Sequence, residues 1–179
     1  MRRESSPSRV PGNLDVEGLR LAILVARFNE DITRELLAGA RACLGEAGVS
    51  GDAVDVHFVP GAWELPQAAA RVVEAGRHDA VVVLGCVIRG ETPHFDFISA
   101  EAARGLGAVA RRSTIPVAFG VLTTDTLAQA EERADRTGQD KGREAALAAL
   151  EMVDVYRRIQ NGDPAPEPGS RGPGATDDA

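Results

Sequence analysis

Residues 80–96 read AVVVLGCVIRGETPHFD, and this stretch decides how the rest of the chain is organised. Residues 80–84 are entirely apolar, which is typical of a strand buried on both faces of a sheet. Residues 95–112 have the pattern of a helix. Between them lie a glycine, a hydroxyl, a proline and a histidine, where an open α/β sheet binds its ligands and where backbone N–H groups face anions. We therefore expect residues 85–94 to form the floor of a functional site.

Three more strands are predicted beside this one. Residues 19–26 form a second apolar run, whereas residues 54–58 alternate apolar and polar side chains, as a strand with one wet face at a sheet edge does. Residues 116–122 form the fourth strand. Helical patterns between the strands imply a parallel sheet with right-handed crossovers. We expect a three-layer α/β fold, with a four-stranded parallel sheet in the flavodoxin-like order 2-1-3-4 and helices on both faces.

The intervals between the strands carry helix signals. Asn29 or Asp31 can cap the first helix and Gly48 can end it, while Thr126 or Asp125 can cap a later one. The predicted helices are 32–47, 66–75, 95–112, 126–134 and 140–159. One domain at residues 13–160 holds all of these elements, between a flexible arm at residues 1–12 and a disordered tail, rich in proline and glycine, at residues 161–179.

Composition limits the partners of this chain of 179 residues. Its formal net charge of −7 argues against binding to nucleic acid or to an acidic membrane surface. No apolar run approaches membrane-spanning length, and the first residues lack a signal-peptide core. Cys43 and Cys86 lie in apolar surroundings without metal or redox spacing. A reduced, cytoplasmic location is the simplest interpretation.

The carboxyl ends of parallel strands meet at one edge of a sheet, so four turns should converge there. They contain Phe28, the turn at residues 61–64, the segment at residues 86–94, and Phe119 with the residues that follow it. We expect Phe28 either to stack on a heterocycle or to belong to the core. Glu64, beside a helix start, either complements the helix dipole or accepts hydrogen bonds from substrate hydroxyls.

His94 is the candidate acid/base. It follows Pro93 at a helix start, where an imidazole can be half-exposed and titrate near neutrality. The alternative is a helix-capping or ordinary surface histidine. His57 and His78 are expected to be solvated, and no two histidines have the spacing of zinc ligands.

Phosphate binding is predicted at the same helix start. Gly90, Glu91 and Thr92 offer backbone N–H groups and a hydroxyl to a phosphate. Arg133 and Lys141, which is the only lysine of the chain, flank a helix break. They either supply positive charge to that phosphate or are ordinary surface residues.

Together these segments resemble the lumazine synthase family, whose members perform the penultimate step of riboflavin biosynthesis. The matching segments are ARFN at 26–29, PGAWELP at 60–66, GCVIRGETPHF at 85–95, PVAFGVLT at 116–123 and KGREAA at 141–146. They occur in order, within residues 11–160. Five motifs in register are far more specific than any one of them alone.

The resemblance implies a transferase that condenses 5-amino-6-(D-ribitylamino)uracil with 3,4-dihydroxy-2-butanone 4-phosphate. The products are 6,7-dimethyl-8-ribityllumazine, phosphate and water, and the reaction uses neither a metal nor an organic cofactor. The resemblance makes His94 the proton shuttle. It assigns the aminouracil to Phe28, Ala62, Trp63, Glu64, Cys86, Val87, Ile88 and Phe119, the ketone phosphate to Glu91, Thr92 and Arg133, and supporting roles to Asn29 and Lys141.

The resemblance also implies self-association into homo-pentamers. The short span from Arg133 to Lys141 favours an icosahedral 60-mer, in which Phe119, Arg133 and Lys141 are lent across a subunit boundary. Riboflavin synthase is an implied partner. The rival interpretations are a non-catalytic paralogue that binds lumazine or flavin or forms a shell, and an archaeal-type riboflavin synthase, which needs no phosphate site.

Overall fold

The computed structural model describes residues 10–11 and 14–164 of the chain. Most of the arm predicted at residues 1–12 and of the tail predicted at residues 161–179 lies outside the described residues. Within the described part, no helix is long and apolar enough to cross a membrane.

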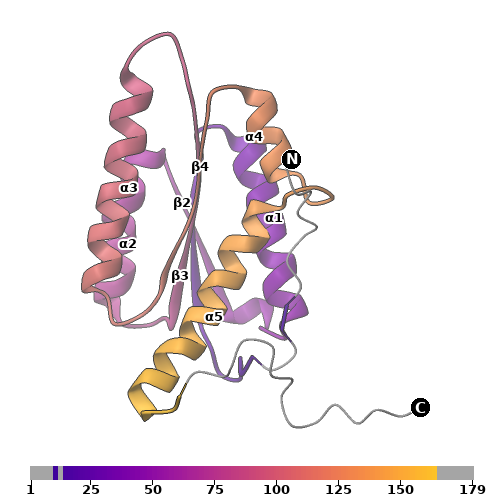
Figure 1. Cartoon of the computed structure of the whole chain (residues 1–179), viewed down its shortest axis with the longest axis vertical. Helices are drawn as coiled ribbons and strands as arrows, with labels where there is room; N and C mark the ends of the chain where they lie inside the picture. The colour runs from indigo at the N-terminus through magenta and orange to yellow at the C-terminus, as the bar shows by residue number, and fades with distance from the viewer. Residues whose placement is uncertain (1–9, 12–13, 165–179) are drawn as a thin grey trace.

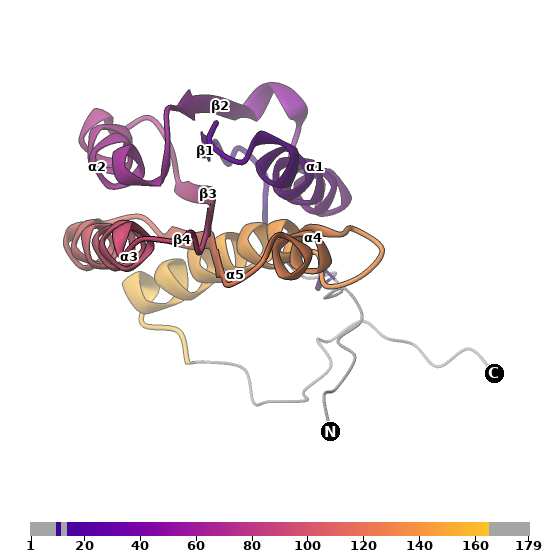
Figure 2. The ribbon, with the colours of Figure 1, turned by 90° about the horizontal axis from the view of Figure 1, so that it is seen from above.

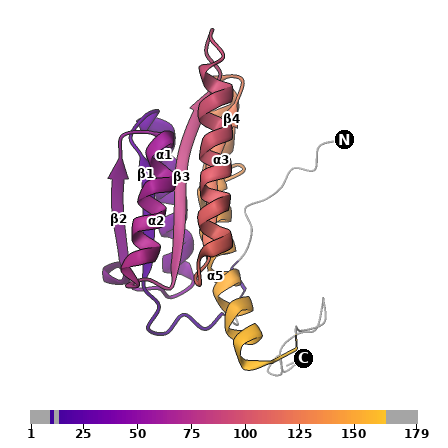
Figure 3. The ribbon, with the colours of Figure 1, turned by 90° about the vertical axis from the view of Figure 1, so that its left-hand side faces the viewer.

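The strands form one parallel sheet in the predicted order β2-β1-β3-β4 (Figure 3). They are β1 (Leu21–Ala26), β2 (Val54–Val59), β3 (Ala80–Ile88) and β4 (Val117–Thr124). Every residue of β1 is buried, and so is every residue of β3 except the last. The continuous apolar runs become the central strands because helices cover both of their faces.

Helices on both faces complete the predicted three layers (Figures 1 and 2). α2 (Leu65–Ala75) and α3 (His94–Arg112) lie on one face, whereas α1 (Glu30–Glu46), α4 (Leu127–Ala134) and α5 (Lys141–Asn161) lie on the other. Two short 3-10 turns, η1 (Gly51–Ala53) and η2 (Ala62–Glu64), flank β2. Side chains of β1 alternate between two cores, because successive residues of a strand point to opposite faces.

The third predicted strand is longer than its apolar run. β3 continues to Ile88 because it pairs with β4 from Val81 onward. Gly85 therefore lies inside a strand and not in a turn. A Cβ at Gly85 would lie 3.0 Å from Leu65, so the missing side chain lets α2 pack closely on the sheet.

The two edge strands also correct the prediction. Phe119 lies in the first half of β4, opposite Val83, and not at the carboxyl edge of the sheet. In β2, Val54 and Val56 pack against the core, but Phe58 is exposed although the alternation placed it with them. An edge strand has a neighbouring strand on one side only, so its last residues can be exposed although the alternation predicts that they are buried.

α1 and α5 approach each other through two glycines. A Cβ at Gly142 would overlap the carbonyl oxygen of Leu36, and one at Gly39 would overlap the carboxylate of Asp140. Asp140 has left-handed backbone geometry with φ of 43°, and its carboxylate accepts a hydrogen bond from the backbone N–H of Arg143 at 3.0 Å. This junction fixes the start of α5 against α1.

His78 is buried, which corrects the expectation that it is solvated. Its Nε2 lies 2.8 Å from a carboxylate oxygen of Asp55, and Arg20 donates to the same oxygen at 3.2 Å. The hydrogen bond with His78, and then that with Arg20, holds the pKa of Asp55 below its ordinary value. The contact joins residues 23 apart in the chain, so no local pattern predicts it. His57 is exposed, as predicted.

Candidate active site

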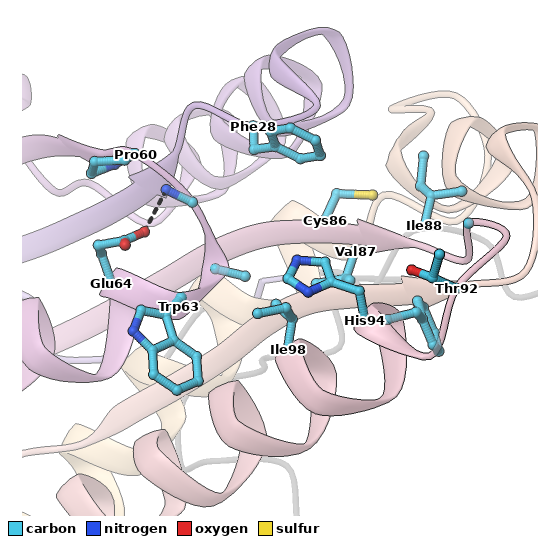
Figure 4. Close-up of a pocket in the computed structure, with 14 residues that line it drawn as sticks. Phe28, Pro60, Trp63, Glu64, Cys86, Val87, Ile88, Thr92, His94 and Ile98 are labelled. Atoms are coloured by element: carbon cyan, nitrogen blue, oxygen red, sulfur yellow. Dashed lines mark hydrogen bonds between the residues drawn. The ribbon is translucent and has the colours of Figure 1, made fainter.

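A cavity of about 480 Å³ opens at the carboxyl edge of the sheet (Figure 4). It lies among the ends of β1 and β3, the η2 turn and the start of α3. Its lining residues are Phe28, Pro60, Gly61, Ala62, Trp63, Glu64, Cys86, Val87, Ile88, Gly90, Thr92, His94, Phe95 and Ile98. Phe28 lies on one side of the cavity and His94 with Ile98 on the other, although separate crossovers carry them (Figure 4).

Most of the predicted site residues come together here. Those that line the cavity are Phe28, Ala62, Trp63, Glu64, Cys86, Val87, Ile88, Thr92 and His94. They come from the end of β3 and from the connections that follow β1, β2 and β3, and they meet because every strand of the sheet points the same way.

The turn after β1 presents Phe28 to the cavity. The N–H of Phe28 donates to the carbonyl of Pro60 at 3.1 Å, which ties this turn to the end of β2. Asn29 precedes α1, as predicted, but its side chain makes no capping hydrogen bond. Its amide donates instead to the carbonyl of Cys86 at 2.9 Å. With the backbone held on both sides, the ring of Phe28 stays 70% exposed and free to contact a ligand.

The η2 turn supplies a second wall. The backbone N–H of Gly61 donates to Glu64 Oε2 at 2.9 Å, which closes the turn. Ala62 is buried beneath it, whereas the indole of Trp63 is 54% exposed. Glu64 thus closes the η2 turn ahead of α2 and is also one of the residues that line the cavity (Figure 4).

The end of β3 forms an uncharged floor. Burial raises the pKa of Cys86 to about 11, so its thiol stays protonated at neutral pH. Val87 and Ile88 follow with apolar side chains at the same wall. This part of the cavity suits a neutral ring better than a charged group.

The loop between β3 and α3 carries the polar part of the cavity. Gly90, Thr92 and His94 line it at the start of α3, where the positive end of the helix dipole lies. Glu91 belongs to the same loop but does not line the cavity. His94 is exposed at the first position of the helix. Residues 90–94 thus offer backbone N–H groups, a hydroxyl and an imidazole to one end of the cavity.

Sequence reasoning missed Arg89, which precedes this loop. Its guanidinium donates to Asp125 at 2.8 Å and to Asp96 at 3.1 Å, and it lies 4.2 Å from the centre of the Phe95 ring. The hydrogen bonds to Asp125 and Asp96 raise the pKa of Arg89 above its ordinary value. Ile98 was missed too, although its position four residues after His94 places both on one face of a helix.

Five predicted site residues do not line the cavity of their own chain, and they are Asn29, Glu91, Phe119, Arg133 and Lys141. The last three are the ones assigned to a subunit boundary. Phe119 is half-exposed in a separate groove between β4 and α3. Arg133, on α4, donates to the carbonyl of Gln129 at 2.9 Å. Lys141 donates to both carboxylate oxygens of Glu144, at 2.8 and 2.7 Å. Their action across a subunit boundary stays a prediction.

Metal binding was not expected. Among residues 10–11 and 14–164, no three His, Cys, Asp or Glu side chains are grouped so that they could hold an ion. The expectation that the reaction uses neither a metal nor an organic cofactor stays a prediction.

The sheet order and the cavity at its carboxyl edge define a flavodoxin-like α/β protein with a ligand site beside a histidine. The sequence model of the 6,7-dimethyl-8-ribityllumazine synthase family matches residues 18–157. A 6,7-dimethyl-8-ribityllumazine synthase of Chlorobium phaeobacteroides is 48% identical over 151 residues, which cover 84% of this chain and 97% of that protein. The chain belongs to the 6,7-dimethyl-8-ribityllumazine synthase family and is an enzyme, a transferase of riboflavin biosynthesis. The non-catalytic alternative is not favoured.

Proposed function

We propose that this chain condenses 5-amino-6-(D-ribitylamino)uracil with 3,4-dihydroxy-2-butanone 4-phosphate to form 6,7-dimethyl-8-ribityllumazine, phosphate and water. The observation that carries the proposal is a single cavity lined by an exposed aromatic ring, a neutral strand end, a loop at a helix start and a histidine. An amine and a ketone condense unaided, so most of the acceleration comes from holding the two substrates in register.

The aminouracil binds between β1 and η2. Phe28 stacks on the pyrimidine, since an exposed ring at a ligand edge can offer its face to a heterocycle. Backbone groups of Ala62, Trp63 and residues 86–88 pair with the polar edges of the pyrimidine. Glu64 accepts hydrogen bonds from the ribityl hydroxyls. Phe119 of a neighbouring copy closes the pyrimidine site, with Asn29 in support through its hydrogen bond to the Cys86 carbonyl.

The ketone phosphate binds at the start of α3. The N–H groups of Glu91 and Thr92 and the Thr92 hydroxyl hold the phosphate, and the helix dipole favours its charge. No lysine or arginine lines this cavity among the described residues. We therefore assign the counter-charge to Arg133 of a neighbouring copy, with Lys141 in support.

His94 moves the protons. The amine attacks the ketone, and loss of water to form the imine needs an acid. A base then removes the proton from the carbon beside the imine, and phosphate leaves from the next carbon to give an enol that becomes a ketone. The ribitylamino nitrogen attacks this ketone, and an acid helps a second water to leave as the ring closes. An imidazole at the first position of α3 lies beside both substrate sites and can serve each step in turn.

Mixing the purified protein with both substrates tests the reaction directly. We expect lumazine absorbance to rise in proportion to free phosphate. Quenching of Trp63 fluorescence by either substrate without new absorbance would instead indicate a binder without catalysis.

Self-association belongs to the same proposal, as pentamers joined into an icosahedral 60-mer. Support comes from the aromatic side chains that a single chain leaves exposed outside the cavity, which are Phe58, Phe97 and Phe119. Sedimentation that shows pentamers only would contradict the shell.

Two further parts of the proposal are a partner and a location. Co-sedimentation with riboflavin synthase tests whether the two proteins associate, and cell fractionation tests the proposed cytoplasmic location.

A further inference from the structure

We propose that Arg89 is a positioning residue for the loop of residues 90–93, and that it sets how well this loop binds the ketone phosphate. The inference rests on the proposed function, because it assigns the phosphate to that loop. Arg89 itself does not line the cavity. It acts through the residues that it holds.

One side chain ties three parts of the carboxyl edge together. Nε of Arg89 donates to Asp125, the first residue after β4, at 2.8 Å. Nη1 donates to Asp96, in the first turn of α3, at 3.1 Å. The guanidinium also covers the ring of Phe95, 4.2 Å from its centre. A planar fork can make these contacts together, whereas a lysine ammonium has no plane to stack on the ring.

These contacts bracket the loop. Arg89 is the last residue joined to β4, through its N–H to the Thr124 carbonyl at 2.9 Å, and Asp96 lies just beyond His94. The pair between Arg89 and Asp96 therefore spans the loop from end to end. Phe95, under the guanidinium, is buried and lines the cavity. A shift of this ring would move the start of α3 and the N–H groups that face the phosphate.

The loop is the part of the site that needs such support. Residues 90–93 are all exposed, so packing contributes little to their conformation. Each ion pair of Arg89 is partly solvated and weak alone, so its loss should leave the fold intact while changing the loop. Arg104 offers a matched control, because it lies on α3 and pairs with Glu101 at 3.1 Å in an exposed position.

The experiment compares Arg89→Gln, Arg89→Lys and Arg104→Gln with the unsubstituted protein, by steady-state kinetics in each substrate. We expect Arg89→Gln to raise KM for the ketone phosphate roughly three- to tenfold, with KM for the aminouracil within about twofold and the melting temperature close to the control. Arg89→Lys should stay impaired because it lacks the fork. Full recovery in Arg89→Lys, or equal changes in both KM values, would overturn the proposal.

A double substitution separates positioning from simple charge. If Arg89 acts through Asp125, the double variant Arg89→Gln with Asp125→Asn should have the same KM for the ketone phosphate as Arg89→Gln alone. Additive increases in KM would contradict a role for the Arg89–Asp125 ion pair. Calorimetry with inorganic phosphate as the probe gives a readout that needs no turnover. Absence of lumazine from the unsubstituted protein would refute the proposed function, and unchanged phosphate affinity in Arg89→Gln would refute the role of Arg89.

Discussion

Two aromatic residues at the cavity share one arrangement. Hydrogen bonds fix the backbone around each residue, whereas its side chain stays exposed. Phe28 lies in a turn held by the Pro60 carbonyl, and Trp63 lies in a turn closed by Glu64. Both rings remain more than half exposed. Such residues lose little conformational freedom when a ligand arrives, which lowers the entropic cost of binding.

Replacement of His94 by alanine should slow turnover by roughly 10²-fold, at the low end of what one positioned acid/base contributes. Activity should stay measurable, because the cavity still holds both substrates together. The rate of lumazine formation under saturating substrates measures the effect. His57→Ala, in an exposed position on β2, is the control and should change nothing. An unchanged rate of lumazine formation in His94→Ala would show that His94 is not the acid/base.

The rate of alkylation of Cys86 should rise at a higher pH than the rate of an ordinary cysteine does. The thiolate reacts, and burial raises the pKa of Cys86 from 9.0 to about 11, so the thiolate fraction at neutral pH falls about a hundredfold. We expect the iodoacetamide rate at Cys86, followed by peptide mass spectrometry, to keep rising with pH beyond 10. A plateau close to pH 9 would show that the thiol is not shielded as the structure indicates.

Helices and strands depend on close backbone contact at a few glycines. The start of α5 rests on α1 where Gly142 faces the Leu36 carbonyl, and α2 rests on the sheet where Gly85 faces Leu65. At these points a methyl group would have to push backbone or a well-packed side chain aside. A side chain should therefore be costly at these glycines and tolerated where the would-be Cβ has open space, as at Gly45.

Gly142→Ala should destabilise the protein by about 2–3 kcal/mol, because the new methyl overlaps a backbone oxygen that cannot move alone. Gly45→Ala is the matched control, since Gly45 lies in α1 with open space around its would-be Cβ. That substitution should be neutral or stabilise by up to ~1 kcal/mol through helix propensity. The midpoints of urea unfolding compare the two. Equal midpoints would mean that α1 and α5 are less tightly packed than described.

The whole molecule presents an electrostatic difficulty for an anionic substrate. The chain carries a formal net charge of −7, and no lysine or arginine lines the cavity among the described residues. A neighbouring copy that contributes Arg133 would resolve it, which ties catalysis to assembly.

Complementation between two impaired variants tests this shared site. If His94 and Arg133 of one site come from different copies, co-refolding His94→Ala with Arg133→Ala should restore about a quarter of full activity, the statistical share of intact sites in a mixed ring. Each variant refolded alone is the control. If both variants assemble but activity does not recover, then either His94 and Arg133 of one site come from the same chain or Arg133 does not contribute to the site.

Local patterns in the sequence were sufficient for the architecture and for much of the site. Continuous apolar runs predicted β1 and β3 in the middle, and alternation predicted β2 at an edge, because burial on two faces or one imposes those patterns directly. Parallel direction then requires Phe28 and His94 to meet at one edge. None of these inferences needs a specific long-range contact.

Other features came only from the tertiary structure. The Asn29–Cys86 hydrogen bond, the His78–Asp55 pair and the Arg89–Asp125 pair join residues 57, 23 and 36 apart. The extension of β3 to Ile88 depends on β4, which follows it by a whole helix. Hydrophobic periodicity reports which face of an element is buried. The partners of polar groups depend instead on which distant segments packing brings within hydrogen-bond distance, and that is decided only when the chain folds.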